Sequence, residues 1–318
     1  MTKDLSFYVK KFSKLRVDRA HGSVAPHKPI LLLSVIELLQ QGEIQQNQIF
    51  LSAELISTFL KYWTHLGSDI HRSDIALPFY HLTGDGFWHL SPNPGFESTI
   101  AAKVKLKSLT ALRNAVNYAF LDDDLFNLLY DSESRSYLIT AIVQEWFSEW
   151  EREFQTLYQV DAFQEFQLRL FEKGGETYSV EDLADEAKTV VRDAAFRKIV
   201  VSLYGQRCAF CRLRIISLDS QNIVDGAHIK PFSEFRDDRF DNGLALCKNH
   251  HWAFDRGWFG INEDYRIIIP HDRFTEESPQ DTRSMKDFDG ELINLPTQAT
   301  HYPRLESLDW HRQRWNIA

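Results

Sequence analysis

Three cysteines and one histidine, arranged in two short pairs, are the residues best suited to bind a metal ion. The pairs are Cys208-x-x-Cys211 and Cys247-x-x-His250, and they contain every cysteine of the chain. Zinc prefers four sulfur or imidazole ligands in a tetrahedron, and a tight turn with two such ligands supplies half of that set. The spacing therefore predicts a structural zinc (Zn2+) site at these four residues. Buried free cysteines are the alternative, and another side chain or water would be the fourth ligand if His250 points away.

A second set of polar residues, interleaved with the first, could hydrolyse a phosphodiester. His251 and Asp255 are four residues apart, so they share one helix face and can hold a single cation. The imidazole of His228 can accept a proton from water near neutral pH, while a cation neutralises charge on a phosphate. Asn242 can orient the histidine ring or tie its loop. The pattern predicts a one-metal centre with His228, Asn242 and His251 as catalytic residues; two satisfied structural histidines are the alternative.

The elements expected around these residues are a strand, a turn with a second strand, and a helix. Residues 224–231 alternate like a strand, 240–246 read as a turn and a short strand, and 249–255 read as a helix start. This order is the unit called ββα-metal.

Four signatures make this region resemble the HNH endonuclease family. They are Ala227-His228-Ile229, Asn242-Gly243-Leu244, His251, and Phe254-Asp255-Arg256-Gly257. The resemblance covers about residues 190–265 and implies a metal-dependent DNA endonuclease using Mg2+, Mn2+ or a similar divalent cation. Many family members carry a metal ligand directly before the first histidine. Ala227 stands there in this chain, so Asp225 is the candidate substitute.

The N-terminal part of the chain reads as mostly helical. Nearly continuous apolar residues predict a buried helix at 29–39, and helical spacing predicts others. These others are expected at 5–19, 51–63, 108–120, 123–130 and 133–157. Two short aromatic segments, 79–82 and 87–90, predict a β-hairpin around a turn that contains glycine. The expected fold is α+β: a mainly helical domain with a small β-hairpin, followed by a C-terminal ββα-metal HNH domain with a structural zinc site.

Motifs in this first part resemble the sulfur-binding domain of phosphorothioate-dependent restriction endonucleases. The motifs are His21-Gly22, the run from Pro26 to Leu33, Leu77-Pro78-Phe79-Tyr80, and Asp85-Gly86-Phe87-Trp88. The relatives are type IV enzymes, McrA-like, that place an HNH domain after this reader. We expect a reader at 1–157, a linker at 158–180 around Gly174-Gly175, and the nuclease at 181–318.

A site that selects sulfur over oxygen must offer apolar surface, because sulfur is larger and less hydrated. Pro78, with Phe79 or Tyr80, is the candidate surface, and packing within the hairpin is the alternative for the aromatic rings. His27 and Lys28, at a helix start, are the candidates for the phosphate charge. Lys103, Lys105 and Lys107 alternate like one face of a strand and could hold flanking phosphates; a solvated face is the alternative.

Bulk composition limits the class of protein. The 318-residue length favours two domains, and the net charge of -9 argues against a general nucleic-acid coat protein. We find no secretion signal and no apolar run long enough to cross a membrane, and the cysteine spacing favours a reducing compartment. The expected location is therefore cytoplasmic.

Three functions remain open at this stage. The first is an HNH endonuclease that cleaves phosphorothioated double-stranded DNA. The second keeps the nuclease but reads a modified cytosine base in an aromatic cage. The third is a catalytically inactive DNA-binding regulator, against which the intact His228 and His251 count. Because one HNH site cuts one strand, double-strand cleavage would indicate a homodimer.

Overall fold

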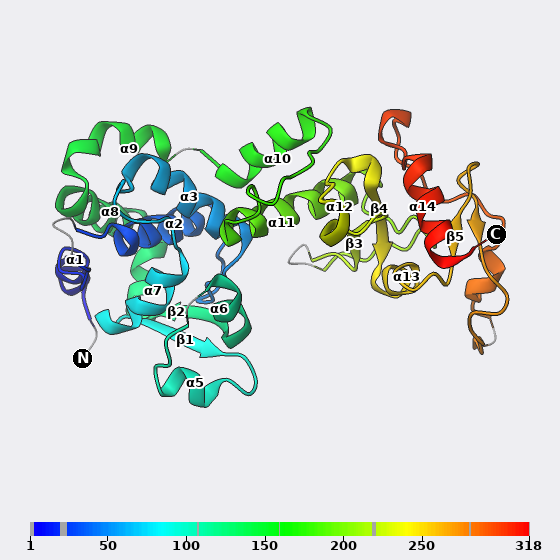
Figure 1. Cartoon of the computed structure of the whole chain (residues 1–318). Coiled ribbons are helices and arrows are strands. Elements are labelled where there is room, and N and C mark those ends of the chain that lie inside the picture. The colour runs from blue at the N-terminus through cyan, green and yellow to red at the C-terminus, as the bar shows by residue number, and fades with distance from the viewer. Residues whose placement is uncertain are drawn as a thin grey trace. The chain divides into compact units, whose positions relative to one another are not determined.

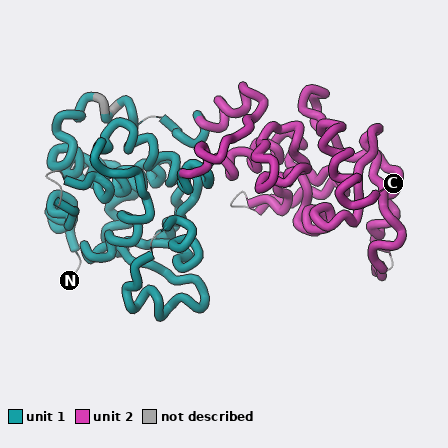
Figure 2. Tube along the Cα trace, in the orientation of Figure 1, with its two compact units in different colours: residues 1–165, 185–191 teal, residues 166–184, 192–318 magenta. Residues whose placement is uncertain are grey.

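The structure, a computed structural model, divides into two compact units. It describes residues 3–19, 24–106, 108–158, 160–217, 221–279 and 281–317. Unit 1 comprises Met1–Glu165 and Asp185–Val191, and unit 2 comprises Phe166–Ala184 and Arg192–Ala318 (Figure 2). Each unit is described by itself below.

Unit 1 is a helical domain with one small sheet (Figure 1). Its helices are α1 (Leu5–Phe12), α2 (His27–Gln41), α3 (Ala53–Leu66), α4 (Ala76–His81), η1 (Leu82–Asp85), α5 (Glu97–Ala101), α6 (Leu109–Ala115), α7 (Asp123–Tyr130), α8 (Ser132–Trp146), η2 (Ser148–Trp150) and α9 (Glu151–Leu157).

Helix α2 is the centre of unit 1 and confirms the predicted buried helix. Every residue from His27 to Leu39 is buried, because the helix is apolar on almost all sides. It packs against α3, α4, α7 and α8. It ends at Gly42, whose φ of 79° gives the left-handed turn that glycine adopts without a steric penalty.

The predicted hairpin at 79–90 is wrong in position, although the domain does contain an antiparallel strand pair. Residues 79–81 lie in α4, and Pro78 lies in its first turn, where proline is tolerated. β1 (Trp88–Pro92) pairs instead with β2 (Val116–Leu121), with Trp88 opposite Leu121. The partner strand was hidden because its residues continue directly from α6 and fit a helical pattern.

A buried ion pair fixes the end of unit 1. The Lys61 ammonium lies 2.6 Å and 2.7 Å from the two carboxylate oxygens of Glu37, and it also donates to the carbonyl oxygens of Leu157 (2.9 Å) and Val160 (3.0 Å). The Tyr62 hydroxyl donates to the same carboxylate. Burial raises the pKa of Glu37 and lowers that of Lys61, so each charge depends on the other for compensation.

Unit 2 contains the predicted strand–strand–helix arrangement. β3 (Val224–His228) pairs antiparallel with β4 (Gly243–Cys247), with Val224 opposite Cys247 and His228 opposite Gly243. Helix α13 (Lys248–Phe254) follows β4 directly and packs on both strands. The expected α+β fold is therefore confirmed.

The remaining elements surround this core. They are α10 (Ala162–Glu172), α11 (Glu186–Leu203), α12 (Phe232–Phe235), η3 (Phe240–Asn242), β5 (Gly260–Ile261), β6 (Ile267–Ile268), η4 (Met285–Phe288), η5 (Ala299–His301) and α14 (Leu305–Trp315). Glycine makes close packing possible at Gly226, where an added Cβ would lie 2.8 Å from the Arg197 Cα of α11.

The glycine pair of the predicted linker packs against the site loop of unit 2. Glu176 O accepts a 2.8 Å hydrogen bond from Asp238 N, and Gly174 O accepts one of 3.2 Å from Phe240 N. Gly175 has φ +90°, and an added Cβ would lie 2.3 Å from the carbonyl oxygen of Asp238. The glycine signal therefore comes from a close backbone approach rather than from a flexible connection.

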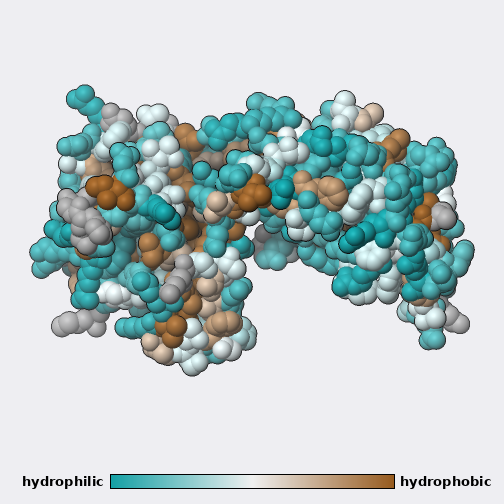
Figure 3. Space-filling view, in the orientation of Figure 1, coloured by the Kyte–Doolittle hydropathy of each residue, from teal (hydrophilic) through white to brown (hydrophobic). Residues whose placement is uncertain are grey.

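The exposed surface agrees with the composition. On the face shown in Figure 3 hydrophilic residues dominate, and hydrophobic residues form scattered patches. None of the described helices is long and apolar enough to span a bilayer.

Candidate functional site

Cys208, Cys211, Cys247 and His250 come together as the sequence predicts. One donor atom of each lies within 4.8 Å of the others, and Cys247 Sγ is 3.0 Å from His250 Nδ1. The cysteines form no disulfide. Four sulfur or nitrogen donors around a zinc ion, at about 2.0 to 2.3 Å from it, are about 3.3 to 3.8 Å apart. The donor set and its compactness therefore fit zinc.

The local structure explains why the four ligands meet. Cys208 and Cys211 lie in a tight turn after α11, closed by hydrogen bonds from Cys208 N to Leu213 O and from Arg212 N to Cys208 O, both 2.9 Å. Cys247 ends β4, and His250 lies in the first turn of α13. The ring of Phe210 stacks on His250 at 4.1 Å and fixes its orientation.

The electrostatics of this cluster favour a cation. Hydrogen bonds from Cys208 and Cys211 lower the pKa of Cys247, which favours its thiolate. Burial opposes a charge on His250, but hydrogen bonds and attraction to Cys211 and Cys247 raise its pKa to about 9. Hydrogen bonds with Cys211 and Cys247 raise the pKa of Cys208, so the negative charge of the cluster is centred on Cys247.

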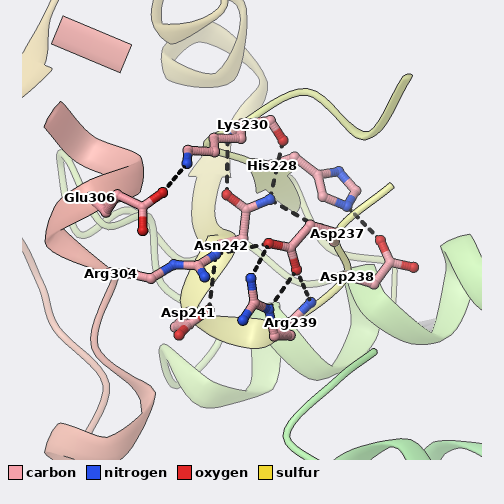
Figure 4. A network of polar contacts seen from close by, with 9 residues as sticks. All are labelled: His228, Lys230, Asp237, Asp238, Arg239, Asp241, Asn242, Arg304 and Glu306. Atoms are coloured by element: carbon pink, nitrogen blue, oxygen red, sulfur yellow. Dashed lines mark hydrogen bonds and ion pairs between the residues drawn. The ribbon is translucent and has the colours of Figure 1, made fainter. Parts of the chain in front are cut away.

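His228 ends β3 in a defined orientation. Its ring lies parallel to Phe196 of α11, with centroids 4.0 Å apart and an interplanar angle of 3°. Its Nε2 lies 2.7 Å from Oδ1 of Asp238, a carboxylate that is completely buried (Figure 4). The His228 side chain is 12% exposed, so one edge remains open to solvent. Sequence reasoning missed Asp238, which belongs to no motif; the acidic pair 237–238 between two motifs was its only signal.

Asn242 ties the loop rather than the histidine ring. Its amide oxygen accepts from Lys230 N at 3.0 Å, and its amide nitrogen donates to Lys230 O at 3.1 Å and to Asp237 O at 3.0 Å (Figure 4). The side chain is fully buried, so these bonds replace water. They fix the residues that follow His228.

Asp237 anchors the same loop from the other side. Arg239 and Arg304 each place an Nη2 2.8 Å from its Oδ2 (Figure 4). Burial alone would raise its pKa, but the hydrogen bonds from these two arginines lower it to about 2. The Asp237 carboxylate is therefore charged at neutral pH.

His251 and Asp255 lie one helical turn apart, with His251 Nε2 3.6 Å from Asp255 Oδ2. The side chains are 23% and 53% exposed, so a cation from solvent can reach both. They supply one nitrogen and one oxygen donor, a mixed set that suits several divalent metals. Among the described residues, only the Cys3His cluster brings three or more such donors within 4.8 Å of one another.

Asp225, the predicted substitute metal ligand, forms two ion pairs. Its Oδ2 lies 2.8 Å from Arg197 Nη1 and 3.0 Å from Lys248 Nζ, so two cations already neutralise it. Alternation along β3 places Asp225 on the face of Ala227, opposite that of His228. Burial alone would raise the pKa of Asp225, but the charges around it, that of His251 among them, lower it. Its role as a metal ligand therefore stays a prediction.

Two candidate reader residues, His27 and Lys28, occupy the first turn of α2 and are largely buried. His27 Nε2 lies 2.9 Å from Arg72 O, and burial lowers the pKa of this histidine. Lys28 Nζ forms a 2.7 Å ion pair with Asp85, a partner that sequence reasoning missed.

The aromatic candidates lie in α4 and are buried with Pro78. Phe79 is completely buried, with its ring at 87° to Trp88, so it packs in the core. Tyr80 is 8% exposed and donates a 3.0 Å hydrogen bond to Val104 O. This bond holds the segment after α5 beside α4.

Lys103 and Lys105 follow α5 in an irregular, exposed segment, so the predicted strand face is wrong. Lys103 has φ 53°, which no strand residue adopts. Burial, together with the charges of Lys28 and Lys105, lowers the pKa of His81 at the end of α4. Residues 28, 81 and 105 therefore lie near one another, and Lys105 is the exposed cation among them, because Lys28 is paired with Asp85. Lys107 and the His21-Gly22 motif lie outside the described residues.

Comparisons with known proteins support both resemblances. A model of the ScoMcrA-like DNA sulfur-binding domain matches residues 6–157, and a model of the HNH endonuclease family matches residues 208–262. None of the curated proteins matches this chain.

Three solved structures are similar to parts of the chain. The sulfur-binding domain of ScoMcrA, complexed with phosphorothioated DNA, is 18% identical over 47% of this chain and 93% of its own, with a TM-score of 0.37. The corresponding SprMcrA complex is 20% identical over 46% and 87%, with a TM-score of 0.34. The modification-dependent restriction endonuclease TagI is 24% identical over 39% of this chain and only 38% of its own, with a TM-score of 0.29. These TM-scores are low, so the family models alone assign the domains.

Proposed function

We propose that this chain, which joins a DNA sulfur-binding domain to an HNH endonuclease domain, is a modification-dependent endonuclease that cleaves phosphorothioated double-stranded DNA. In this proposal residues 1–157 read the modification, 158–180 connect the domains, and 181–318 contain the nuclease. The observation that carries it is the placement of His228 at the end of β3, in the same ββα unit as His251 and Asp255 of the α13 segment.

The chain's own residues divide the chemistry among them. His228 accepts the proton of the attacking water through the solvent-facing edge of its ring, while Phe196 and Asp238 hold the ring still. Asn242 and Asp237 keep the loop after β3 in place. His251 and Asp255 are the residues that would hold a divalent cation such as Mg2+ or Mn2+. When bound, that cation supplies electrostatic stabilisation of the charge that develops on the phosphate.

The Cys3His cluster is proposed as a structural zinc site. Zinc there would join the turn after α11 to the junction of β4 and α13, the helix that carries His251. Its contribution would be folding free energy, because four protein ligands leave no open position for substrate.

The reader site is proposed on the surface around α4. Leu77 and Val104 are 39% and 49% exposed there, and they offer apolar surface close to the exposed Lys105. Apolar surface suits sulfur, and cations suit the rest of the phosphate. His27, Pro78 and Tyr80 would shape this site, Lys103 would contact a flanking phosphate, and Phe79 would support the site from the core.

One experiment separates this function from its alternatives. Phosphorothioated, cytosine-methylated and plain duplexes of one sequence are incubated with the protein and Mg2+ or Mn2+. We expect cleavage of the phosphorothioated duplex alone. His228→Ala should bind this duplex with unchanged affinity and cut it at least about 10²-fold more slowly, the usual contribution of a general base.

The matched control is His271→Ala, which removes an exposed histidine outside the site. It should cut at the wild-type rate. Cleavage of the methylated duplex alone would assign a base reader, and tight binding without cleavage under any metal would assign a regulator.

A further inference from the structure

Asp238 is a fully buried carboxylate placed between two partners. Its Oδ1 lies 2.7 Å from His228 Nε2, and its Oδ2 lies 2.7 Å from Nη1 of Arg192, on α11. The side chain of Asp238 is 0% exposed and that of Arg192 is 7% exposed. Each oxygen therefore has one strong, charge-compatible donor, and neither oxygen depends on water.

The surroundings hold this carboxylate in one position. Its backbone N–H donates to Glu176 O at 2.8 Å, so the segment after the glycine pair braces the loop. The Arg192 guanidinium lies 3.6 Å above the ring of Phe232. The same helix supplies Phe196, on which the His228 ring stacks at 4.0 Å. Helix α11 thus supplies Phe196, which fixes the plane of the imidazole. It also supplies Arg192, which holds Asp238, the acceptor of the imidazole's hydrogen bond.

This geometry determines where the proton of neutral His228 lies. An ionised carboxylate only accepts hydrogen bonds, so Nε2 must carry the hydrogen and Nδ1 must carry the lone pair. Among the described residues, no hydrogen-bond partner occurs for Nδ1, and the side chain is 12% exposed. The lone pair is therefore available to a water molecule at the open edge of the ring.

We propose that Asp238, oriented by Arg192, is a positioning residue that holds His228 in the Nε2–H tautomer, so that Nδ1 is the atom that deprotonates the attacking water. The kinetic consequence of this inference rests on the proposed nuclease function. The tautomer of His228 does not depend on that function. When water loses its proton to Nδ1, the ring becomes an imidazolium, and the negative charge of Asp238 stabilises it through the Nε2–H bond. No other proton moves in this step.

The substitution Asp238→Asn gives a sharp test because Arg192 determines how the amide must turn. The guanidinium only donates, so the amide oxygen faces Arg192 and the amide NH2 faces His228. The NH2 group then donates to Nε2, which forces the hydrogen onto Nδ1. The variant is expected to keep its shape and to carry the wrong tautomer.

The tautomer is measured by NMR, from the correlation of the ring nitrogens with the ring carbon-bound protons. Full-length protein is used at about pH 8, where an ordinary imidazole is neutral. His228→Gln identifies the signals of this residue. We expect the Nε2–H pattern in the wild type and the Nδ1–H pattern in Asp238→Asn. An Nδ1–H pattern in the wild type overturns the proposal, and this measurement does not depend on the folding of any variant. An unchanged pattern in Asp238→Asn also overturns it.

Single-turnover cleavage provides the second measurement. Asp238→Asn should lower the rate of cutting by about 10- to 100-fold without changing the affinity for the duplex. In a His228→Ala background the same substitution should have no further effect, because Asp238 acts through that ring. A further loss there would indicate a structural role and overturn the proposal.

The matched control is Asp241→Asn in the same loop, whose carboxylate makes no contact with His228. It should leave the His228 tautomer unchanged. If the wild-type protein cuts no DNA, the proposed function fails, and the tautomer measurement still decides the role of Asp238.

Discussion

Several functional side chains of unit 2 are held in place by residues that belong to no sequence motif. The sequence could single out His228, Asn242, His251 and the zinc ligands as candidates, because their types and spacing are fixed by local chemistry. Asp238 could not, because its role depends on a contact with Arg192, 46 positions away in the chain. The ion-pair partners of Asp225 were missed for the same reason: Arg197 and Lys248 come from α11 and α13.

His311 allows a prediction at this scale. It is 3% exposed, its ring stacks on Phe254 at 3.7 Å, and its Nε2–H donates to Phe254 O at 2.9 Å. Burial, followed by the nearby Arg312 charge, lowers its pKa to about 4, although the bond to Phe254 O opposes the shift. Above about pH 6.5 the residue is neutral in the folded and unfolded states, so it has no pH-dependent effect there. As the pH falls, the unfolded state takes up the proton first, and folding stability is lost down to about pH 4.

The expected loss from His311 is about 3 kcal/mol over that interval. Unfolding free energies of wild type and His311→Gln, measured by urea at several pH values between about 8 and 4, isolate this contribution. The wild type should lose more stability than the variant as the pH falls. Parallel curves for the two proteins would contradict the assignment.

At the scale of elements, those defined by local pattern were predicted correctly, whereas the long-range pairing of strands was not. Strands β3 and β4 and helix α13 were predictable because alternation, a turn and helical spacing follow one another within about thirty residues. Strand β1 was assigned to the wrong partner because β2 begins at Val116, beyond two intervening helices. A short aromatic segment carries no information about which distant strand completes its hydrogen bonds.

The segment at Gly175 gives the prediction that belongs to this scale. Gly175→Ala adds a Cβ 2.3 Å from Asp238 O at a backbone with φ +90°. Strain in the left-handed region and displacement of the loop together should cost about 2 to 4 kcal/mol. Because the displaced loop carries Asp238, the cleavage rate should also fall.

The neighbouring Gly174→Ala is the control for this substitution. It has φ +73° but nothing within 4 Å of an added Cβ, so it should cost only about 1 to 2 kcal/mol and leave the cleavage rate unchanged. Thermal unfolding and single-turnover cleavage of both variants measure the difference. Equal effects of the two substitutions would show that the approach to Asp238 is unimportant.

For the whole molecule, the net charge of -9 limits general attraction to DNA, so the proposed contact depends on local cations such as the exposed Lys105. The composition therefore could be used to exclude a coat protein, but not to locate the contact. Residues 28, 81 and 105 come from three separate segments, and only the folded chain brings them together.

This charge distribution predicts how binding should respond to salt. Phosphate contacts weaken as salt rises, for modified and plain duplexes alike, whereas contact between apolar surface and sulfur does not. The ratio of the two dissociation constants should therefore stay within about threefold between about 50 mM and about 200 mM salt, while both constants rise. Titration of each duplex at several salt concentrations measures this ratio. A ratio that approaches one as salt increases would assign the selectivity to charge.

The buried ammonium of Lys61 sets a minimum length for any excised N-terminal fragment. Two of its four oxygen partners are the main-chain carbonyls of residues 157 and 160, at and just after the end of α9. A fragment cut at the end of α9 would delete one of these carbonyls and fray the other, so the buried ammonium would keep only Glu37 as its partner. Expression boundaries for an isolated reader should therefore be drawn beyond Val160, not at the end of α9.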